Sequence, residues 1–153
     1  MNTVATTSTQ IPAMRERDVD LVRRLEGTAL DKPQVLAPTK HLIHGGIYCR
    51  TMFAPAGVLI TGALIKINTT VAISGDVTFY VGGKSIDFSG YNVIPAYAGR
   101  KQAVLVHTDS YITMLFQTTA TSVEEAEKEF TDEYELLGSH KVEELNTTLV
   151  TGV

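Results

Sequence analysis

Histidine and cysteine are the residues of this chain best suited to metal binding or nucleophilic chemistry, and the sequence contains five of them: His41, His44, His107, His140 and Cys49. His41 and His44 are three residues apart, a spacing that would let both imidazoles bind one metal ion on a helix. Gly45 and Gly46 follow at once, and glycines disfavour a helix there. One hypothesis is a metal site that joins His41, His44 and His107. The other is a structural role for His107, with its ring hydrogen-bonded to the loop that follows.

Cys49 and the glycine-rich turns give little support for covalent or phosphate chemistry. Arg50 follows Cys49, but neighbouring residues of a strand point to opposite faces, so the guanidinium need not lower the pKa of the thiol. The sequence has no Gly-x-Ser-x-Gly motif to expose a serine nucleophile. Gly82-Gly83-Lys84 lacks the glycine spacing of a phosphate-binding loop and predicts a two-residue hairpin turn. We therefore interpret Cys49 as a buried thiol.

All of these residues except His140 lie in a β-rich block, 41–117, that would have to position them. Short runs of β-branched and aromatic residues alternate there with turn signals such as Pro55-Ala56-Gly57, Ser74-Gly75-Asp76 and Thr108-Asp109-Ser110. The runs cover 48–53, 58–67, 71–74, 77–81, 93–94, 103–107 and 112–116. Strands this short, separated in this way, predict an antiparallel sandwich or barrel.

Two flanking regions complete a single predicted domain. Residues 1–40 form an N-terminal arm, in which 1–10 are rich in Thr and Ser and expected to be flexible, 12–25 predict a short helix that Gly27 ends, and 28–40 predict an extended connector. Residues 41–120 form the barrel. In 121–153, the capping box Ser122-Val-Glu-Glu125 predicts the start of a helix that Gly138 ends, followed by a tail without clear periodicity.

Composition excludes several function classes. The chain has 153 residues, is 44% hydrophobic and carries a formal net charge of -4 with its basic residues scattered, so we expect a globular core and no nucleic-acid partner. A single cysteine excludes a disulfide within the chain. The N-terminus lacks a basic region followed by an apolar one, and no run approaches the roughly 18 apolar residues of a membrane span. We therefore expect neither a signal peptide nor a membrane partner.

The β-rich block resembles a family of small single-domain cupins that are common among the genes of tailed bacteriophages. The resemblance covers about half of the chain and depends on the order and spacing of Ile47-Tyr-Cys-Arg-Thr-Met-Phe-Ala-Pro-Ala-Gly57, Thr61-Gly62, Ser74-Gly75-Asp76-Val77, Gly99-Arg-Lys101 and Val106-His107-Thr-Asp109. It implies an all-β fold, a cupin-like antiparallel β-barrel of the jelly-roll type, here with an extended N-terminal arm and a C-terminal acidic helix. It also implies an oligomer, and often a metal ion inside the barrel.

The positions at which this family carries metal ligands hold other residues here. Counted from the Thr-Gly step, the two histidine positions are Ile65 and Asn68; the general cupin spacing, counted from Gly57, gives Ala63 and Ile65 instead. Hydrocarbon and amide side chains are not strong ligands of a divalent ion. The remaining ligand positions are Thr69, Thr70 and Gln102. We therefore predict no metal site, no other cofactor and no catalytic residue.

The resemblance and the missing ligands together predict a non-enzymatic structural component of a tailed-phage virion, such as a capsid decoration, neck or tail protein, assembled in the host cytoplasm. Its expected partners are copies of itself in a homo-oligomer and other virion proteins. The alternative is a small-molecule-binding protein or a metal-independent cupin enzyme of the isomerase, epimerase or lyase type, with His107 as base and Tyr97 or Lys101 as acid. A third hypothesis assigns the acidic helix, with seven Asp and Glu between 124 and 135, to a basic protein partner.

Overall fold

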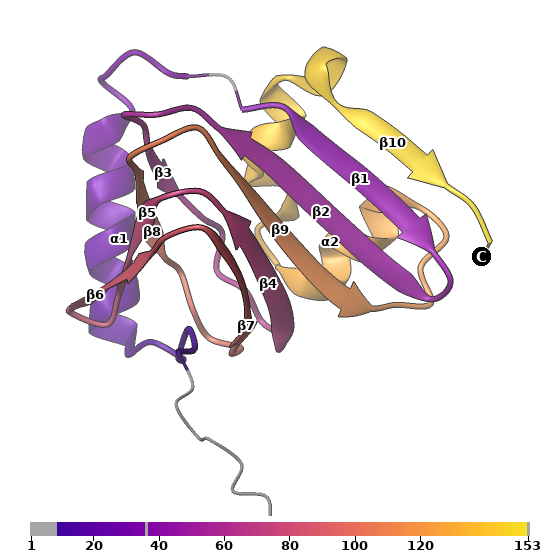
Figure 1. The fold of residues 1–153 in the computed structure, drawn as a ribbon, viewed down its shortest axis with the longest axis horizontal. Helices are drawn as coiled ribbons and strands as arrows, with labels where there is room; N and C mark the ends of the chain where they lie inside the picture. Colours follow the sequence, from indigo (N-terminus) through magenta and orange to yellow (C-terminus); the bar gives the residue numbers. More distant parts are fainter. Residues whose placement is uncertain (1–8, 36, 153) are drawn as a thin grey trace, which may run out of the picture.

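Residues 9–35 and 37–152 are described by the computed structural model, and they form two layers (Figure 1). The larger sheet has six strands in the order β10-β1-β2-β9-β4-β7, and the smaller sheet has four in the order β3-β8-β5-β6. The strands are β1 (Thr39–His44), β2 (Ile47–Ala54), β3 (Leu59–Thr61), β4 (Thr69–Ser74), β5 (Val77–Val81), β6 (Lys84–Phe88), β7 (Tyr91–Ala96), β8 (Ala103–Val106), β9 (Ser110–Gln117) and β10 (Thr147–Val150). The α-helices are α1 (Glu16–Ala29) and α2 (Val123–Phe130).

The six-stranded sheet has a buried inner face and an uncovered outer face. Side chains alternate between the two faces along each strand, as they must in a pleated strand. In β1, for example, Thr39, His41 and Ile43 are buried, whereas Lys40 and His44 are exposed. The β1 strand is antiparallel to β2 and parallel to β10, so the sheet is mixed at this edge.

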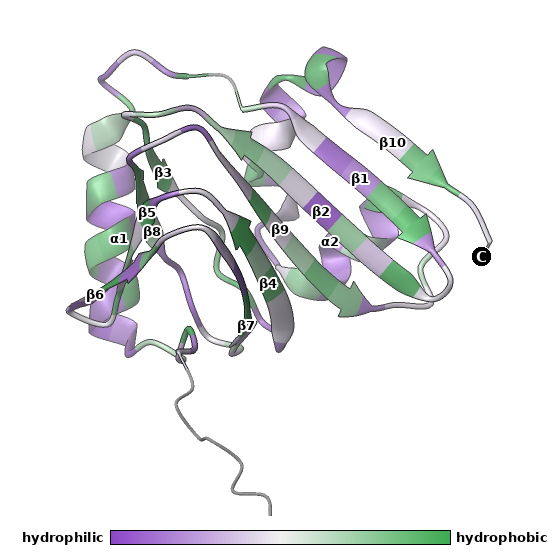
Figure 2. Cartoon of the chain, in the orientation of Figure 1, coloured by the Kyte–Doolittle hydropathy of each residue, from purple (hydrophilic) through white to green (hydrophobic). Residues whose placement is uncertain are grey.

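Two separate hydrophobic cores cover the inner face. The first lies between the two sheets and includes Val71 and Ile73 from β4 and Phe79 from β5. The second lies beneath α2, where Tyr48, Phe116 and Phe130 pack with their ring centroids 5.4 to 6.4 Å apart. Figure 2 shows hydrophobic residues along the central strands of both sheets, and hydrophilic residues on much of the two helices. The second layer therefore changes from strands to helical segments along the length of the large sheet.

The N-terminal region closes one end of the sandwich. Ile11 is fully buried in the first core, and its backbone pairs with β7 through bonds from Ile11 N to Pro95 O at 3.0 Å and from Tyr97 N to Ile11 O at 2.9 Å. A helix does follow, but it begins at Glu16 and runs through Gly27 to Ala29, so the predicted bounds of 12–25 were wrong. The flexible arm predicted for 1–10 falls largely on residues 1–8, which lie outside the described residues.

The C-terminal region begins with the predicted capping box. The Oγ atom of Ser122 accepts a hydrogen bond from the backbone N of Glu125 at 3.2 Å, and the Glu125 side chain accepts one from Thr121 N at 3.0 Å. The helix ends at Phe130, earlier than the predicted Gly138. Three 3₁₀ turns follow: η1 (Tyr134–Leu136), η2 (Gly138–Lys141) and η3 (Glu143–Leu145). These turns lead to β10, which the sequence did not predict.

The fold is mostly β with some helix, a two-sheet β-sandwich with two α-helices, so the prediction of an all-β, wholly antiparallel barrel was correct only in part. The hairpin turn predicted at Gly82-Gly83 is confirmed: both glycines have positive φ, and Val81 pairs with Lys84 across the turn. Within the described ranges, no helix is long and apolar enough to cross a membrane.

Candidate functional site

The positions that the family uses for metal ligands lie where the chain crosses between the two layers. Ile65 is 8% exposed and belongs to the second core, against which Ala63 and Ile67 also pack. The Oδ1 atom of Asn68 accepts a hydrogen bond from the backbone N of Ala98 at 2.9 Å, so this amide holds a loop. These side chains complete the hydrophobic packing and the loop structure around them.

A buried guanidinium group occupies the space between the two cores. Arg100 is 1% exposed and donates from Nη1 to Tyr97 O at 3.0 Å and from Nη2 to the Oγ1 of Thr69 at 2.8 Å, with the Sδ of Met114 3.8 Å from Nη2. Burial lowers the pKa of Arg100 to about 10, which still leaves it positively charged at neutral pH. A fixed cation beside a hydrocarbon and a hydroxyl is a poor setting for a divalent metal ion. The residues present therefore do not fit the metal site that the fold family implies.

The contacts of Lys101 give this residue a structural role rather than a catalytic one. Its side chain is 1% exposed, and Nζ lies 3.2 Å from Glu26 Oε2 on α1, 2.8 Å from Gly62 O and 3.6 Å from Glu133 Oε2. Lys101 thus ties α1 and the segment after α2 to the sandwich. Because its side chain is almost fully buried among these partners, Lys101 is not exposed to a substrate.

His107 lies at the other end of β8 from Lys101, and its Nε2 atom is 2.8 Å from the Oγ1 of Thr78. Thr78 in turn donates to Asp87 Oδ1 at 2.6 Å, so this histidine caps a hydrogen-bonded chain on the small sheet. A four-residue strand and its flanking residues separate His107 from Lys101 by roughly 20 Å. The pairing of His107 as base with Lys101 as acid is therefore not present in the structure, and Tyr97 is tied to Arg100 through its backbone.

The three histidines of the hypothetical metal site, His41, His44 and His107, do not converge. His41 points to the inner face of β1 and His44 to the outer face, because Gly45 and Gly46 form the hairpin turn that keeps this segment a strand. The structure places His107 on the small sheet. Over the described ranges, no group of three His, Cys, Asp or Glu side chains is arranged to hold a metal ion.

A polar cluster that the sequence did not predict lies beside the second core. His41 and Arg50 are paired in register on neighbouring strands, with both side chains on the inner face. Glu127 reaches them from α2, and its buried carboxylate accepts from Arg50 Nη1 at 3.2 Å and contacts His140 Nε2 at 2.8 Å. Arg50 also donates from Nη2 to the Oγ of Ser139 at 2.8 Å. This cluster joins β2, α2 and η2.

His41 and Tyr48 form the base of the same region. The Nδ1 atom of His41 is 2.7 Å from the hydroxyl of Tyr48. Burial, together with the nearby Arg50 and His140, lowers the pKa of His41 to about 4. Burial also raises the pKa of the Tyr48 phenol above its usual value. Both groups are thus neutral at physiological pH, next to the charged pair of Arg50 and Glu127.

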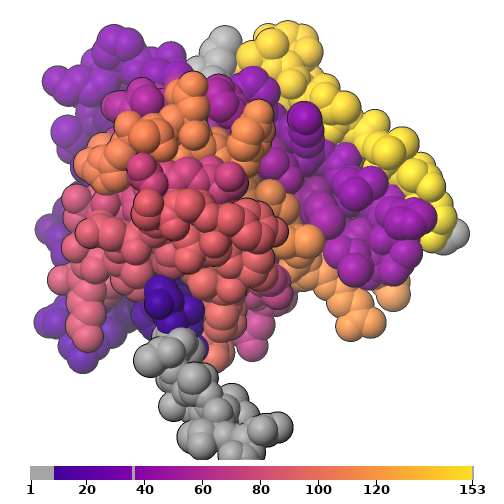
Figure 3. Space-filling model, in the orientation of Figure 1, coloured from indigo at the N-terminus to yellow at the C-terminus, as the bar shows by residue number. Residues whose placement is uncertain are grey.

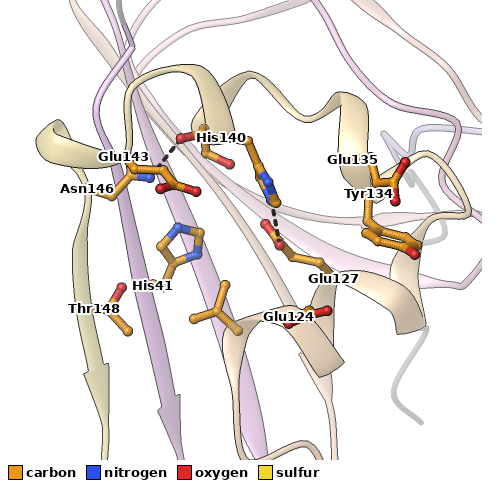
Figure 4. A pocket seen from close by; sticks show the side chains of 11 residues that line it. His41, Glu124, Glu127, Tyr134, Glu135, His140, Glu143, Asn146 and Thr148 are labelled. Carbon is orange, nitrogen blue, oxygen red and sulfur yellow. Dashed lines mark hydrogen bonds and ion pairs between the residues drawn. The ribbon is translucent and has the colours of Figure 1, made fainter.

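A pocket of about 500 Å³ opens above this cluster, between α2, the 3₁₀ turns and the edge formed by β1 and β10. Figure 4 shows His41 at the base of the pocket, with the hydrogen-bonded pair of His140 and Glu127 on one side and Thr148 on the other. Three further glutamates line it, and they are Glu124, Glu135 and Glu143. Acidic and neutral polar groups therefore face one cavity.

The outer face of the large sheet is the second candidate site. In Figure 1, α2 lies behind β1, β2 and β9, and Figure 3 shows strands of this sheet at the surface on the viewer's side. We use "outer face" for the residues that point away from both cores in this sheet: Lys40, Leu42, His44, Ile47, Cys49, Thr51, Phe53, Thr70, Ala72, Ser74, Tyr91, Val93, Pro95, Tyr111, Thr113, Leu115, Gln117, Thr147 and Leu149. Cys49, predicted to be buried, is half-buried here. Lys40 is the sole Lys, Arg, Asp or Glu in this set.

No protein-family model matches the sequence, and no curated protein matches it. Solved structures with a similar fold include a cupin superfamily protein from Desulfitobacterium hafniense, which is 13% identical with a TM-score of 0.48 over 71% of this chain and 94% of that one. Salicylate 1,2-dioxygenase from Pseudoaminobacter salicylatoxidans is 11% identical with a TM-score of 0.49 over 84% of this chain and 40% of its own. The cupin domain of an XRE family transcriptional regulator from Enterobacter cloacae is 10% identical with a TM-score of 0.39, over 46% of this chain and 80% of that one.

Such distant likenesses concern the fold alone. They include enzymes, a regulator domain and proteins of unknown function, so they favour no activity, ligand or partner for this chain. Function must be argued from the chain's own surfaces and clusters.

Proposed function

We propose that this protein is a non-enzymatic structural protein that associates with copies of itself through the outer face of the six-stranded sheet. The observation that carries the proposal is the composition of that face. A solvated sheet face ordinarily carries polar and charged residues. Here Val93 is 56% exposed and Tyr91 is 73% exposed, and leucine, isoleucine, phenylalanine and threonine fill about half of the other positions.

A second copy of the chain is the occupant that fits this face best. With one charged side chain in the whole set, the face needs no complementary charges from a different protein. Six strands spaced by about 4.8 Å and about 20 Å long give roughly 550 Å² for each copy, hence about 1,100 Å² in total. That total reaches the lower end of the range for specific protein interfaces, about 1,000 to 1,200 Å². The area and the composition together favour a homodimer.

The setting that we propose for this assembly is a tailed-phage virion, with other virion proteins as neighbours. Its support is the resemblance of 44–117 to small phage cupins. Detection of the protein by mass spectrometry in purified particles of a phage that encodes it would test this part separately. Its absence from such particles would contradict the virion assignment and leave self-association to be tested alone.

The competing proposal, a metal-independent cupin enzyme, has less support. Its expected base, His107, and Lys101, one of its two expected acids, are at opposite ends of β8, and the space between the sheets is filled by the first core. A catalytic pair must face one substrate within hydrogen-bond reach, and these side chains do not.

The oligomeric state in solution tests the proposal. We expect light scattering after size exclusion to give the mass of a dimer for the native chain at micromolar concentration. Leu115→Arg places a cation at the centre of the outer face, opposite Cys49 and Thr70 in the neighbouring strands, and should give a monomer.

Leu136→Arg is the matched control, because Leu136 is 73% exposed on η1, away from the outer face. This variant should stay dimeric. A monomeric native chain would contradict the proposal, and so would loss of the dimer in both variants.

A further inference from the structure

We infer that β10 is a second self-association site, at which two copies of the chain pair their β10 strands antiparallel and join their six-stranded sheets edge to edge. This contact goes beyond the proposed function, because it uses the backbone at the rim of the sheet, whereas the proposed dimer uses the outer face. The inference depends on the open hydrogen-bonding groups of β10, on the protection of the other sheet edges and on the symmetry of the strand.

The β10 strand presents an open backbone edge. It lies at the rim of the large sheet, beside β1 (Figure 1). The backbone N of Thr151 donates to Ile43 O at 2.9 Å, so the backbone groups of Thr151 point toward β1, as do those of Leu149 two residues earlier. The N–H and C=O groups of the alternate residues, Thr148 and Val150, therefore point away from β1. Residues 9–35 and 37–152 supply no hydrogen-bond partner for them.

Among the described strands, the three other sheet edges carry features that disfavour pairing with another chain. At the opposite edge of the large sheet, β7 contains Pro95, which lacks an N–H, and Ile11 pairs with this strand. In the small sheet, β6 presents the charged Lys84 and Asp87, and β3 has three residues. Proline, charge, short length and a covering segment are the usual protections of an edge strand. Residues 146–152 contain neither proline nor a charged side chain, so β10 has none of the chemical protections.

A second copy of β10 satisfies the open groups of this strand. When the two strands run antiparallel about a two-fold axis at Leu149, Thr148 of each copy faces Val150 of the other, and each such pair exchanges two backbone hydrogen bonds. The open N–H and C=O groups of both copies are then all paired. Leu149 faces its own copy in the closer type of pair, so two side chains that are each 56% exposed pack together. Thr147 faces Thr151 in the flanking pairs, and no like charges are opposed.

This edge contact is compatible with the proposed outer-face dimer. The two-fold axis at Leu149 is perpendicular to the sheet, so the outer faces of the two copies stay on the same side of one continuous sheet. Four backbone hydrogen bonds and one pair of leucines make a small contact, for which we expect a Kd of about 1 mM. At micromolar concentration the outer-face dimer is therefore the main species, and the edge contact forms as the concentration rises.

Cross-linking of Leu149→Cys by oxidised glutathione tests the inference at a protein concentration of about 1 mM. All variants also carry Cys49→Ala and Leu115→Arg, so the native thiol cannot react and the result does not depend on the outer-face contact. Facing residues in the closer pairs have Cα atoms about 4.5 Å apart, within the range of a disulfide. We expect a disulfide-linked dimer on a non-reducing gel. Leu30→Cys, at a position that is 62% exposed at the end of α1, is the control and should cross-link about tenfold more slowly. Equal rates would overturn the inference.

A proline at the open edge separates strand pairing from collision of side chains. Val150→Pro removes an N–H that points away from β1, so it leaves the ladder between β1 and β10 intact. It should slow the cross-linking of Leu149→Cys about tenfold, whereas Val150→Thr, which keeps the N–H and the β-branch, should not. In the cross-linked dimer, the amide protons of Thr148 and Val150 should also exchange with solvent more slowly than in the monomer, as measured by NMR. Cross-linking that Val150→Pro does not slow, or unchanged exchange of these two amides, would overturn the inference.

Discussion

Along its length, the inner face of the large sheet packs against strands in one half and against helical segments in the other. The first half faces the small sheet, and its core consists of aliphatic and aromatic residues with Ile11 sealing the end. The second half faces α2 and three 3₁₀ turns, and a charged cluster borders its aromatic core. Strands cover a sheet continuously, whereas a short helix and turns leave a gap at the rim. The same face therefore provides rigid core in one half and an accessible polar pocket in the other.

The largest effect should come from the all-strand half. Phe79 is fully buried and stacks edge to face on Phe88 with centroids 5.4 Å apart. Phe79→Ala should reduce the free energy of unfolding by about 4 kcal/mol, because a cavity remains between two sheets that cannot close around it. Urea denaturation measures this loss. Phe130→Ala beneath α2 should cost less, since the helix can move inward, and an equal or larger cost for Phe130→Ala would contradict the comparison.

The second effect concerns the charged cluster. Glu127→Ala leaves Arg50 without its carboxylate at a position where the Arg50 side chain is 15% exposed, so we expect a loss of about 3 kcal/mol in urea denaturation. The exposed pair of Glu124 and Lys128 provides the control, and Glu124→Ala should cost less than about 1 kcal/mol. A combined Arg50→Met and Glu127→Leu variant should recover most of the loss. If Glu127→Ala and Glu124→Ala reduce the free energy of unfolding equally, the buried pair of Arg50 and Glu127 contributes no more than an exposed pair.

The smallest of these effects is a pH dependence in the pocket half. His41 has a pKa of about 4 when folded and 6.5 as a free side chain, so the unfolded chain binds the extra proton first as pH falls. Stability from this group is present above pH 6.5 and is lost between pH 6.5 and about 4, by about 2 kcal/mol once screening by solvent in the pocket is allowed for. Urea denaturation of the native chain and of His41→Asn at pH 7 and pH 4.5 isolates the contribution of His41 to the free energy of unfolding.

The groups that face His41 in this experiment are Arg50 and Tyr48 on β2, Glu127 on α2 and His140 on η2. They are present in both proteins, so the difference between the two slopes reports on His41. Parallel slopes would contradict a buried neutral imidazole.

Local signals in the sequence predicted local structure well. The capping box at Ser122 and the hairpin at Gly82-Gly83 are confirmed, because each depends on residues within a few positions of each other. Gly27 was read as a helix end, but α1 packs Val19 and Val22 on the sandwich, and that burial compensates for the lower helix propensity of glycine. Packing against distant residues thus moved the bounds of the helix.

The candidate site could not be predicted in the same way. Arg50 and Glu127 are 77 residues apart, and Arg50 and Ser139 are 89 apart, so no spacing rule joins them. The strand β1 carries Lys and His among its apolar residues and was passed over, although its inner His41 is paired with Tyr48. No local sequence pattern predicts that Arg100 is buried without a carboxylate partner.

The position of Ile11 constrains the order in which the protein can fold while it is being synthesised. Its backbone partners, Pro95 and Tyr97, leave the ribosome long after it does. Strands β8 and β9, which join the earlier strands within each sheet, are made later still. The side chain of Ile11, translated among the first of the described residues, therefore cannot be enclosed in the first core until most of the domain has been synthesised.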